Sequence, residues 1–452
     1  MSARSCQVVI LAAGEGKRMR SAMPKVMHPV AGLPMLGHVL AAAQATGASR
    51  VSVVHGPGAA SVADYAARAG AEVFEQAERL GTAHAVLAAR SALTDPADDV
   101  LVVYGDTPLV SGATLGRMRE ALANGADLAV LGFTAADPRG YGRLIVRDGA
   151  LAAIREQRDA STEERAVTLC NGGAMAFRGP GMLALLDRIG KANAQGEYYL
   201  TDAVALANTD GKSVVVVETG EDEVRGVNDR LQLAVVEALW QLAARQRAMA
   251  GGATLVAPET VHFAYDTVTG SDVLIEQNVV FGPGVVLEDG STVRAFSHLE
   301  GARIATGAMV GPYARLRPGA EIGARARIGN FVEIKNAGIG EGTKVNHLSY
   351  VGDASVGPHS NLGAGTITCN YDGIGKHRTE IGAGVFIGSN SALVAPLRIG
   401  DEAYIGSGSV ITEDVSPGAL AIGRGRQIEK PGWVARFRAR MAAARQSTRQ
   451  SD

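Results

Sequence analysis

The chain has 452 residues, with 44 lysines and arginines against 46 aspartates and glutamates, so its formal net charge is −2. This near-neutral charge argues against a strongly basic nucleic-acid-binding protein. Hydrophobic residues make up 46% of the chain and aromatic residues only 5%, whereas there are 57 glycines. This composition favours tight, repetitive packing over a core of bulky side chains, and the length indicates two or three domains.

The three cysteines, Cys6, Cys170 and Cys369, lie far apart and form no CxxC pair. We therefore expect neither a disulfide framework nor a structural zinc site, and we expect a reducing compartment. A nucleophilic role stays open for Cys170 or Cys369, although neither has a neighbouring histidine to activate its thiol. No apolar stretch is long enough to cross a membrane, and we expect no secretion signal.

Up to about Gly226, short apolar runs alternate with segments of helical periodicity. This alternation predicts a mainly parallel sheet covered by helices on both faces. Ligands of such sheets bind beyond the carboxyl ends of the strands, here in the loops after Ala12 and Tyr104. The predicted strands are 8–12, 51–55, 100–104, 128–133 and 214–218, and a helix is predicted at 36–46.

A second helix is predicted from Asp229 to Met249. Asn228 or Asp229 can cap its first turn, and two glycines follow its end. We interpret this helix as a connection between two domains. Its apolar residues at helical spacing are Leu231, Val235, Leu239 and Leu242.

From Val268 to Ile334, ten of the twelve residues at every sixth position are aliphatic, and Thr292 and His298 are the exceptions. The pattern slips by one residue at Ile339, is interrupted at about 357–380, and resumes from Ile381 to Ile411. One aliphatic and one small residue in a six-residue period are typical of a parallel β-helix, with one short strand and one corner per hexapeptide. Coils stacked at roughly 4.8 Å each are expected between residues 254 and 428. This register places His298 in the core, where a structural role is expected.

Three segments in the first half suit nucleotide chemistry. LAAGEGKRM at 11–19, followed by Pro24-Lys25, lets backbone amides approach a phosphate, and Arg18 and Lys25 can neutralise a triphosphate. It is neither a P-loop nor GxGxxG, so an ordinary strand-to-helix turn is the competing interpretation. QAERLGTA at 76–83 offers an amide and a glycine turn to a uracil edge. Asp106, in YGDTPL, either holds Mg²⁺ or is a solvated turn carboxylate.

Four segments of the second half differ from the simple hexapeptide pattern of aliphatic and small residues: RLRPG at 315–319, NFVEIK at 330–335, NHLSY at 346–350, and the residues from Asn361 to Gly373. They carry guanidinium, ammonium, imidazole and phenol groups. An insertion in a β-helix is expected to project as a loop. The competing interpretation is a β-helix that only assembles subunits.

The motifs LAAGxGxRM with a downstream Pro-Lys, QxxxxGTxHA and YGDxPL resemble those of the sugar-1-phosphate nucleotidylyltransferases. With the hexapeptide repeat, the chain resembles the bifunctional members that join N-acetylglucosamine-1-phosphate uridyltransferase to glucosamine-1-phosphate acetyltransferase. The resemblance extends to about Glu429. It implies a Rossmann-like α/β nucleotidylyltransferase domain at 1–227, a linker helix at 228–250, a left-handed parallel β-helix at 251–429 and a polar, poorly ordered tail at 430–452.

For the first site, the resemblance implies that Arg18 and Lys25 act on the triphosphate and that Asp106 and Asn228 hold Mg²⁺. Lys17, Gly172 and Asp229 depart from the family's usual residues. The residues implied to bind UTP or the UDP-sugar are Leu11, Ala12, Ala13, Gly14, Lys25, Gln76, Gly81, Thr82, Tyr104, Gly142, Glu156, Asn171 and Asn228, with Thr201 as a further lining residue.

For the second site, the resemblance implies that His347 is the general base for the sugar amine that attacks acetyl-CoA. An unperturbed imidazole pKa near 6.5 suits that task, and Glu333 could orient the ring. Arg317, Lys335, Tyr350 and Asn361, and less closely Lys376, are implied to bind glucosamine-1-phosphate. The implied acetyl-CoA contacts are Ala364, Asn370, Tyr371, Ser389, Ser407 and Arg424.

The implied activity is acetyl transfer from acetyl-CoA to glucosamine-1-phosphate, followed by uridylyl transfer from UTP with release of pyrophosphate. It implies Mg²⁺ for uridylyl transfer, acetyl-CoA and UTP as co-substrates, and small-molecule substrates. It also implies a homotrimer in the bacterial cytoplasm serving cell wall synthesis, without nucleic-acid or membrane partners. Two alternatives stay open: a monofunctional nucleotidylyltransferase with a structural β-helix, and a scaffold of two degenerate domains, against which the retained Lys25, Asp106, Asn228, Lys335 and His347 argue.

Overall fold

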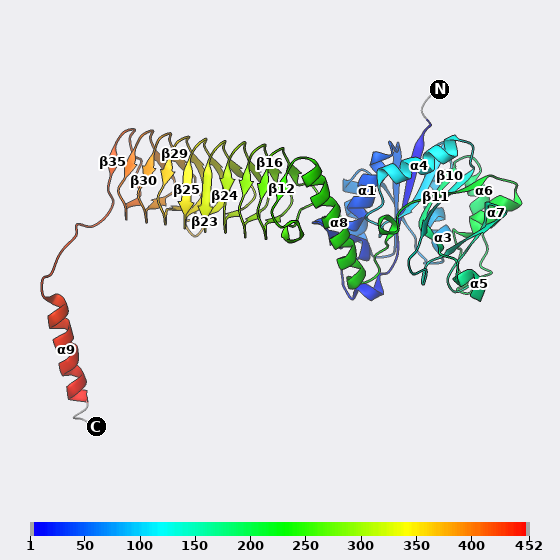
Figure 1. Ribbon diagram of the computed structural model, residues 1–452, viewed down its shortest axis with the longest axis horizontal. Helices are drawn as coiled ribbons and strands as arrows, with labels where there is room; N and C mark the ends of the chain where they lie inside the picture. The colour runs from blue at the N-terminus through cyan, green and yellow to red at the C-terminus, as the bar shows by residue number, and fades with distance from the viewer. Residues whose placement is uncertain (1–3, 449–452) are drawn as a thin grey trace. The chain divides into compact units, whose positions relative to one another are not determined.

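The computed structural model describes residues 4–448. They form two compact units that divide at about residue 268, with Val280–Val285 grouped with the first unit (Figure 1). The first unit contains the central sheet with its helices, and the second contains most of the repeat.

The first unit is built on a nine-stranded sheet with the strand order β11-β7-β10-β6-β1-β4-β5, to which the hairpin β8-β9 is joined through β10. β1 pairs in parallel with β4 and β6, and β10 is antiparallel to β6 and β7. The predicted mainly parallel sheet is therefore confirmed, although β5, β8, β9 and β10 were not predicted. The strands are β1 (Cys6–Ala12), β4 (Arg50–His55), β5 (Glu72–Glu75), β6 (Asp99–Tyr104), β7 (Leu128–Thr134), β8 (Arg143–Arg147), β9 (Ala150–Arg155), β10 (Leu169–Arg178) and β11 (Val214–Glu218), beside a small hairpin of β2 (Pro29–Val30) and β3 (Leu33–Pro34).

Helices cover both faces of this sheet, as the sequence predicts. Successive side chains of a strand point to opposite faces, so Ile10 of β1 packs in one apolar cluster and Val9 in the other. The first cluster includes residues of α1 (Met35–Ala45), α2 (Ala60–Arg68) and α4 (Gly112–Ala123). The second includes residues of α3 (Thr82–Ala88), α6 (Met182–Leu186) and α7 (Asp202–Thr209), and the short α5 spans Thr162–Arg165.

The predicted connecting helix is α8 (Arg230–Ala250). Its first turn is capped by Asp229, whose Oδ1 accepts a hydrogen bond from the Gln232 N–H at 2.9 Å. Leu231 and Leu242, which set the apolar spacing in the sequence, are 81% and 50% exposed. The buried side of α8 instead carries Gln241, whose carboxamide donates to the Phe263 carbonyl at 2.7 Å and accepts from the Phe263 N–H at 2.8 Å.

The repeat folds into a parallel β-helix with three rows of short strands. The longer strands β24 and β26 bend round a corner and belong to two rows. One row holds β14 (Leu274–Ile275), β17 (Thr292–Val293), β20 (Met309–Val310), β23 (Arg327–Asn330), β25 (Lys344–His347), β27 (Asn361–Leu362), β30 (Phe386–Ile387), β33 (Tyr404–Ile405) and β35 (Leu420–Ala421). The other two rows hold β16 (Val286–Leu287), β19 (Ala302–Ile304), β22 (Ala320–Ile322), β24 (Glu333–Ile339), β26 (Tyr350–Val356), β29 (Thr379–Ile381) and β32 (Leu397–Ile399), and β18 (His298–Leu299), β21 (Arg315–Leu316), β28 (Ile367–Cys369), β31 (Ala392–Val394) and β34 (Val410–Ile411). The strands at the beginning of the repeat are β12 (Thr254–Leu255), β13 (Val268–Thr269) and β15 (Val280–Phe281).

The predicted core register is correct from Ile304 onward and wrong by one residue before it. Ile304 and Ile334 are buried as predicted, whereas Phe281 and Leu299 are buried in place of their predicted neighbours Val280 and His298. The reason is that Leu299 and Ile304, two successive core residues, are five residues apart instead of six. Paired apolar residues such as Val280-Phe281 hide this shift in the sequence. The core role expected for His298 is therefore wrong, because its side chain is exposed.

The interruption predicted at 357–380 is shorter in the structure. Leu362 and Thr368 are buried at the next core positions, so the coil continues through β28. Thr368 was missed because threonine is not aliphatic. It can occupy a core position because its hydroxyl is hydrogen-bonded to the backbone of Gly352, at 3.0 Å to the carbonyl and 2.8 Å to the N–H. A loop follows at 370–378 and projects as expected of an insertion, since Ile374 at its tip is almost fully exposed.

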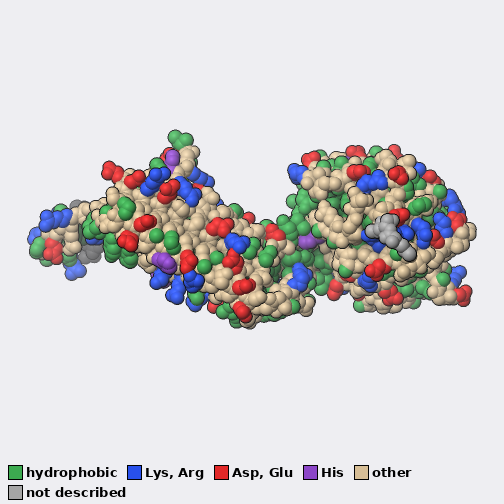
Figure 2. All heavy atoms as spheres, turned by 90° about the horizontal axis from the view of Figure 1, so that it is seen from above, with side chains coloured by type: hydrophobic (Ala, Val, Ile, Leu, Met, Phe, Trp, Pro, Cys, Tyr) green, Lys and Arg blue, Asp and Glu red, His purple; other side chains and the backbone are tan. Residues whose placement is uncertain are grey.

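After the β-helix, the chain forms helix α9 (Trp433–Thr448), and the expectation that this tail is poorly ordered stays a prediction. Residues 449–452 of the predicted tail lie outside the described residues. No helix among residues 4–448 is long and apolar enough to cross a membrane. On the face seen in Figure 2, acidic and basic side chains are interspersed over both units, in keeping with the small net charge.

Candidate active sites

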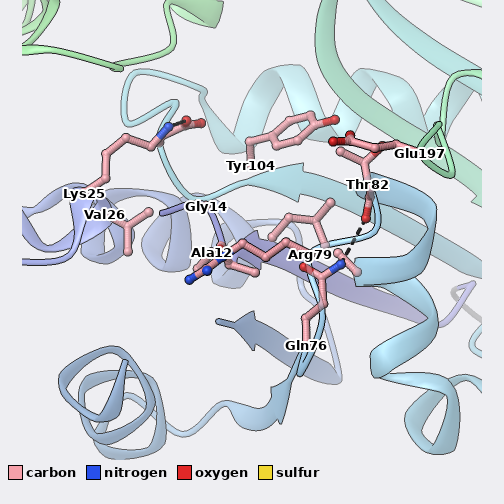
Figure 3. A pocket seen from close by; sticks show the side chains of 14 residues that line it. Ala12, Gly14, Lys25, Val26, Gln76, Arg79, Thr82, Tyr104 and Glu197 are labelled. Carbon is pink, nitrogen blue, oxygen red and sulfur yellow. Dashed lines mark hydrogen bonds and ion pairs between the residues drawn. The ribbon is translucent and has the colours of Figure 1, made fainter. Parts of the chain in front are cut away.

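A cavity of about 270 Å³ lies in the first unit at the carboxyl ends of β1 and β6, where the sequence places the nucleotide loop and Asp106 (Figure 3). Most of the residues implied to bind UTP meet there. The cavity is lined by Leu11, Ala12, Ala13, Gly14, Lys25, Val26, Gln76, Arg79, Gly81, Thr82, Ala85, Tyr104, Asp106 and Glu197.

The loop after β1 passes close to Lys25 through two short 3₁₀ helices, η1 (Lys17–Met19) and η2 (Lys25–Met27). Gly16 has φ +67°, and a Cβ atom there would lie only 2.7 Å from Cβ of Lys25. A side chain at residue 16 would therefore collide with the lysine as well as strain the backbone. This close approach directs the Lys25 ammonium group into the cavity.

Lys25 contacts both of the residues that are implied to hold Mg²⁺. Its Nζ forms an ion pair with the Asp106 carboxylate and lies 3.2 Å from Oδ1 of Asn228, although these residues are far apart in the sequence. A carboxylate and an amide oxygen thus converge on one cation, and both are donor types that Mg²⁺ accepts. No group of three His, Cys, Asp or Glu side chains suited to a metal occurs among the described residues.

The opposite wall of the cavity is the turn that is expected to read uracil. Gly81 has φ +114°, and a Cβ atom there would lie 2.5 Å from the Tyr198 carbonyl oxygen, so only glycine fits. The Thr82 hydroxyl accepts a hydrogen bond from the Leu200 N–H at 2.9 Å. Gln76 donates from Nε2 to the Gly81 carbonyl at 3.1 Å, which fixes its side chain against this turn (Figure 3).

The residues implied to contact the sugar form a second group next to Tyr104. The Thr201 hydroxyl donates to Glu156 Oε1 at 3.3 Å, and the Asn171 N–H donates to the Gly142 carbonyl at 2.8 Å. Burial raises the pKa of the Glu156 carboxyl and also that of the Tyr104 phenol. The sugar group and the cavity therefore share Tyr104 as a common wall.

One predicted cation of the nucleotide loop does not reach the cavity: Arg18 is exposed on η1 and does not line it. Lys17, which departs from the family's usual residue, pairs with Glu15 at 3.0 Å. Sequence reasoning also overlooked Arg79, whose Nε donates to the Ala13 carbonyl at 2.8 Å and ties the uracil turn to the nucleotide loop. Its place inside the quoted segment 76–83 was the only available signal.

In the second unit, five residues lie in one column along an edge of the β-helix, each at the position before a corner. Three backbone bonds set the column: Leu348 N–H to Asn330 O at 3.0 Å, Asn390 N–H to Ala364 O at 2.7 Å, and Gly408 N–H to Ser389 O at 2.8 Å. The register pairs Asn330 directly with His347. The column therefore brings His347 together with three of the implied acetyl-CoA contacts; its members are Asn330, His347, Ala364, Ser389 and Ser407.

His347 is held by Asn330 and not by Glu333. Its Nδ1 lies 2.7 Å from Oδ1 of Asn330. Glu333 is occupied by two arginines, at 2.9 Å from Arg317 and 3.6 Å from Arg315. The expectation that Glu333 orients the imidazole ring is therefore not supported by the structure.

A cationic cluster lies on the adjoining face. Lys335 Nζ lies 3.8 Å from Asp353 Oδ2. Lys376 lies close to Lys335, and the positive charge of Lys335 lowers the pKa of Lys376. Asn370 donates to Asp353 and lies 3.4 Å from the Tyr350 hydroxyl. Burial raises the pKa of the Asp353 carboxyl, but hydrogen bonds from Asn336 and Asn370 and the charge of Lys335 outweigh it, and the net pKa is lowered. Sequence reasoning overlooked Asp353 because it carries no motif signal.

Three residues implied for this site stand apart from the cluster. Asn361 lies on β27, paired with Lys344 in a different row of strands. Tyr371 is exposed on the projecting loop, where its hydroxyl donates to the Gly373 carbonyl at 2.7 Å. Arg424 follows β35 at the end of the β-helix.

The cysteines show no sign of activation in the part of the chain that the structure describes. All three are free thiols, and Cys6 and Cys170 are buried. Burial raises the pKa of the Cys170 thiol, which lowers the thiolate fraction that a nucleophile needs. The structure therefore gives no support to a catalytic cysteine beside Asn171.

Comparison with known proteins agrees with both sites. Residues 8–170 match the family model of the MobA-like NTP transferase domain, and residues 301–336 and 378–413 match that of the bacterial transferase hexapeptide (six repeats). The chain is thus a nucleotidyltransferase joined to a hexapeptide-repeat transferase with a left-handed parallel β-helix. This confirms the predicted fold class.

The full-length relatives identify the family. Bifunctional protein GlmU of Azorhizobium caulinodans is 62% identical over 97% of this chain and 98% of its own length. The proteins of the same name from Xanthobacter autotrophicus and Agrobacterium fabrum are 61% and 56% identical, over 97% and 99% of this chain and 98% and 99% of their own lengths. The chain belongs to the family of bifunctional GlmU proteins, enzymes that combine uridyltransferase and acetyltransferase activities.

Proposed function

We propose that the two activities are divided between the two units. The second unit transfers the acetyl group of acetyl-CoA to glucosamine-1-phosphate, and the first transfers the uridylyl group of UTP to N-acetylglucosamine-1-phosphate with release of pyrophosphate. The observation that carries this assignment is that two separate groups of functional side chains lie in the two units: a nucleotide cavity around Lys25 in the first, and an imidazole-bearing column at His347 in the second.

In the first unit, the sugar phosphate oxygen attacks the α-phosphorus of UTP, and the bond to the pyrophosphate oxygen breaks. The phosphate nucleophile is already anionic, so no strong base is required. Lys25 stabilises the charge that develops on the phosphates, and Gln76 and Gly81 hold the uracil ring. Tyr104, Glu156, Asn171 and the neighbouring Gly142 place the sugar.

Mg²⁺ fits the donor set at the end of this cavity. Asp106 and Asn228 would hold it, because their oxygens already converge on the ammonium group of Lys25. A site with only two protein donors suits Mg²⁺, which commonly keeps waters and takes substrate phosphate oxygens as further ligands. The ion would neutralise phosphate charge and orient the leaving pyrophosphate.

In the second unit, His347 removes a proton from the sugar amine as its nitrogen attacks the thioester carbonyl. The C–S bond then breaks, and coenzyme A leaves as a thiol after taking up the proton. Asn330 supports this role, because an amide oxygen can only accept a hydrogen bond. Its contact with Nδ1 keeps the proton on that nitrogen and leaves Nε2 of His347 free to act as the base.

The cationic cluster is proposed to receive the phosphate of glucosamine-1-phosphate. Lys335 and Lys376 lie close together, and a phosphate dianion between them would relieve their mutual repulsion. Arg317, Tyr350 and Asn361 would complete the sugar-phosphate contacts. Acetyl-CoA is proposed to lie along the column of Ala364, Ser389 and Ser407, with Asn370, Tyr371 and Arg424 as further contacts.

The hexapeptide repeat favours oligomerisation, and we propose a homotrimer. Phe296, Tyr313 and Phe331 stack in a ladder along one edge, with ring centroids 5.0 and 5.3 Å apart, and Leu348 continues this edge. All four side chains are exposed, and together they offer an apolar strip to another copy of the chain. We propose the bacterial cytoplasm as the setting, because the free thiols suit a reducing compartment.

Two single substitutions test the division of labour. Asp106→Asn is expected to abolish metal-dependent pyrophosphate release while thiol release from acetyl-CoA continues. His347→Ala is expected to abolish thiol release while pyrophosphate release from supplied N-acetylglucosamine-1-phosphate continues. Loss of both activities in one correctly folded variant would contradict the assignment of the activities to separate units.

A further inference from the structure

The Gln76 carboxamide has its two ends in different surroundings. Gln76 is only 3% exposed, and its backbone N–H donates to the His55 carbonyl at 2.8 Å, so its backbone is fixed to the sheet. Nε2 lies 3.1 Å from the Gly81 carbonyl oxygen and 3.1 Å from Nδ1 of His84. An amide nitrogen carries two hydrogens, and these two acceptors use both. In Figure 3 the amide nitrogen of Gln76 lies at the dashed hydrogen bond and its oxygen lies on the other side of the carboxamide, in a side chain that lines the cavity.

His84 is itself held in place. It lies in the first turn of α3, and its ring stacks on that of Tyr198 with centroids 6.2 Å apart and planes at 20°. The backbone of Tyr198 accepts a hydrogen bond from the Ala83 N–H at 2.9 Å and donates one to the Leu80 carbonyl at 2.8 Å. The ring therefore presents Nδ1 to Gln76 from a fixed direction. For Nδ1 to accept from the amide, its proton must lie on Nε2 instead.

This arrangement makes one orientation of the carboxamide much better than the other. If the amide turned over, its oxygen would face the Gly81 carbonyl, which can only accept, and Nδ1 of His84 could donate to it only after the ring proton had moved from Nε2 to Nδ1. In the observed orientation the oxygen is left to accept from the nucleotide. Uracil offers an N–H donor at N3, whereas cytosine has a lone pair there and would be repelled.

We propose that His84 is a positioning residue for base selection: it fixes the Gln76 carboxamide with its oxygen toward the cavity, so that the pocket accepts a uracil nucleotide and rejects a cytosine nucleotide. The inference rests on the proposed binding of UTP in this cavity. It adds a residue that does not touch the reacting atoms and acts only through Gln76.

The test compares kcat/KM for UTP and CTP, measured as pyrophosphate release with N-acetylglucosamine-1-phosphate. His84→Leu keeps a similar volume and removes the acceptor, and we expect the UTP-to-CTP ratio to fall about tenfold. His84→Asn is the matched control, because its oxygen can take the place of Nδ1, and we expect a ratio within about threefold of the parent chain. Thiol release from acetyl-CoA serves as the measure that both variants are folded.

A double-mutant cycle separates positioning from general damage. In a Gln76→Leu background, His84→Leu is expected to leave the UTP-to-CTP ratio unchanged, because there is no longer an amide to orient. An unaltered ratio in His84→Leu alone, or an equal fall in both backgrounds, would overturn the inference. If His84→Leu does not fold, His84→Ala takes its place in the same cycle.

The outcomes distinguish this inference from the proposed function. A parent chain that releases pyrophosphate with neither UTP nor CTP would refute the proposed uridylyl transfer. A parent chain that uses UTP selectively, with variants that keep this selectivity, would refute only the role of His84. Equal use of UTP and CTP by the parent chain would also overturn the inference.

Discussion

At the residue scale, both proposed sites pair an imidazole ring with a carboxamide, and the two pairs exchange the roles of hydrogen-bond donor and acceptor. In the nucleotide cavity, His84 accepts from Gln76 and fixes the amide. In the β-helix, Asn330 accepts from His347 and fixes the ring. The first pair serves binding and the second serves proton transfer, and in each the residue next to the substrate depends on a partner that the motifs alone do not reveal.

Asn330→Ala tests the second pair. Without the amide oxygen, the proton of His347 can move to Nε2, which removes the base, and we expect kcat for acetyl transfer to fall at least about tenfold. Thiol release measures this, and pyrophosphate release is expected to stay unchanged. Asn330→Asp keeps an acceptor and is the control, so an equal loss in both variants would contradict a role in fixing the tautomer.

Asp353 predicts a pH dependence of stability. Its pKa is lowered in the folded chain, so its stabilising contribution is present above the pKa of the unfolded chain, near 3.9, and is lost as the pH falls through the lower, folded value. We expect urea unfolding of the parent chain to show a loss of stability as the pH falls below about 4. In Asp353→Asn this loss is expected to be smaller. An identical pH profile in both chains would show that the pKa of Asp353 does not change on folding.

At the scale of elements, the sequence predicts the alternating strands and the repeat, because each follows from a short local period. The antiparallel strand β10 was missed because its place depends on pairing with distant strands and not on a local pattern. The edge strand β5 and the hairpin β8-β9 were not predicted either. The same limit applies to the sites. Motifs indicate Lys25, Asp106 and His347, but the contacts of Asn330, Arg79 and Asp353 form only when separate coils or loops meet.

The core register gives a direct test at this scale, with a matched control one residue away. Phe281 is 3% exposed and Val280 is 39% exposed. We expect Phe281→Ala to destabilise the β-helix by about 3–5 kcal/mol, because it leaves a cavity next to Phe263, and Val280→Ala to cost less than about 1 kcal/mol. Denaturant unfolding measures both. A larger loss for Val280→Ala would contradict the register described here.

At the scale of the whole molecule, the exposed aromatic ladder predicts self-association. Tyr313 stacks between Phe296 and Phe331, so Tyr313→Glu places a charge in the middle of the apolar strip. We expect the parent chain to have the mass of a trimer in light scattering and Tyr313→Glu to have a smaller mass at the same concentration. A trimeric Tyr313→Glu chain would indicate that the copies meet through another surface.

The most direct test of the central claim, that one chain carries both activities in two separate units, is a single reaction with two readouts. The purified chain receives glucosamine-1-phosphate, acetyl-CoA, UTP and Mg²⁺, and free thiol and pyrophosphate are followed separately. We predict that both products appear and that pyrophosphate appears only when acetyl-CoA is present. Pyrophosphate formed from supplied N-acetylglucosamine-1-phosphate, with no thiol released under any condition, would contradict the claim and leave the β-helix as a scaffold.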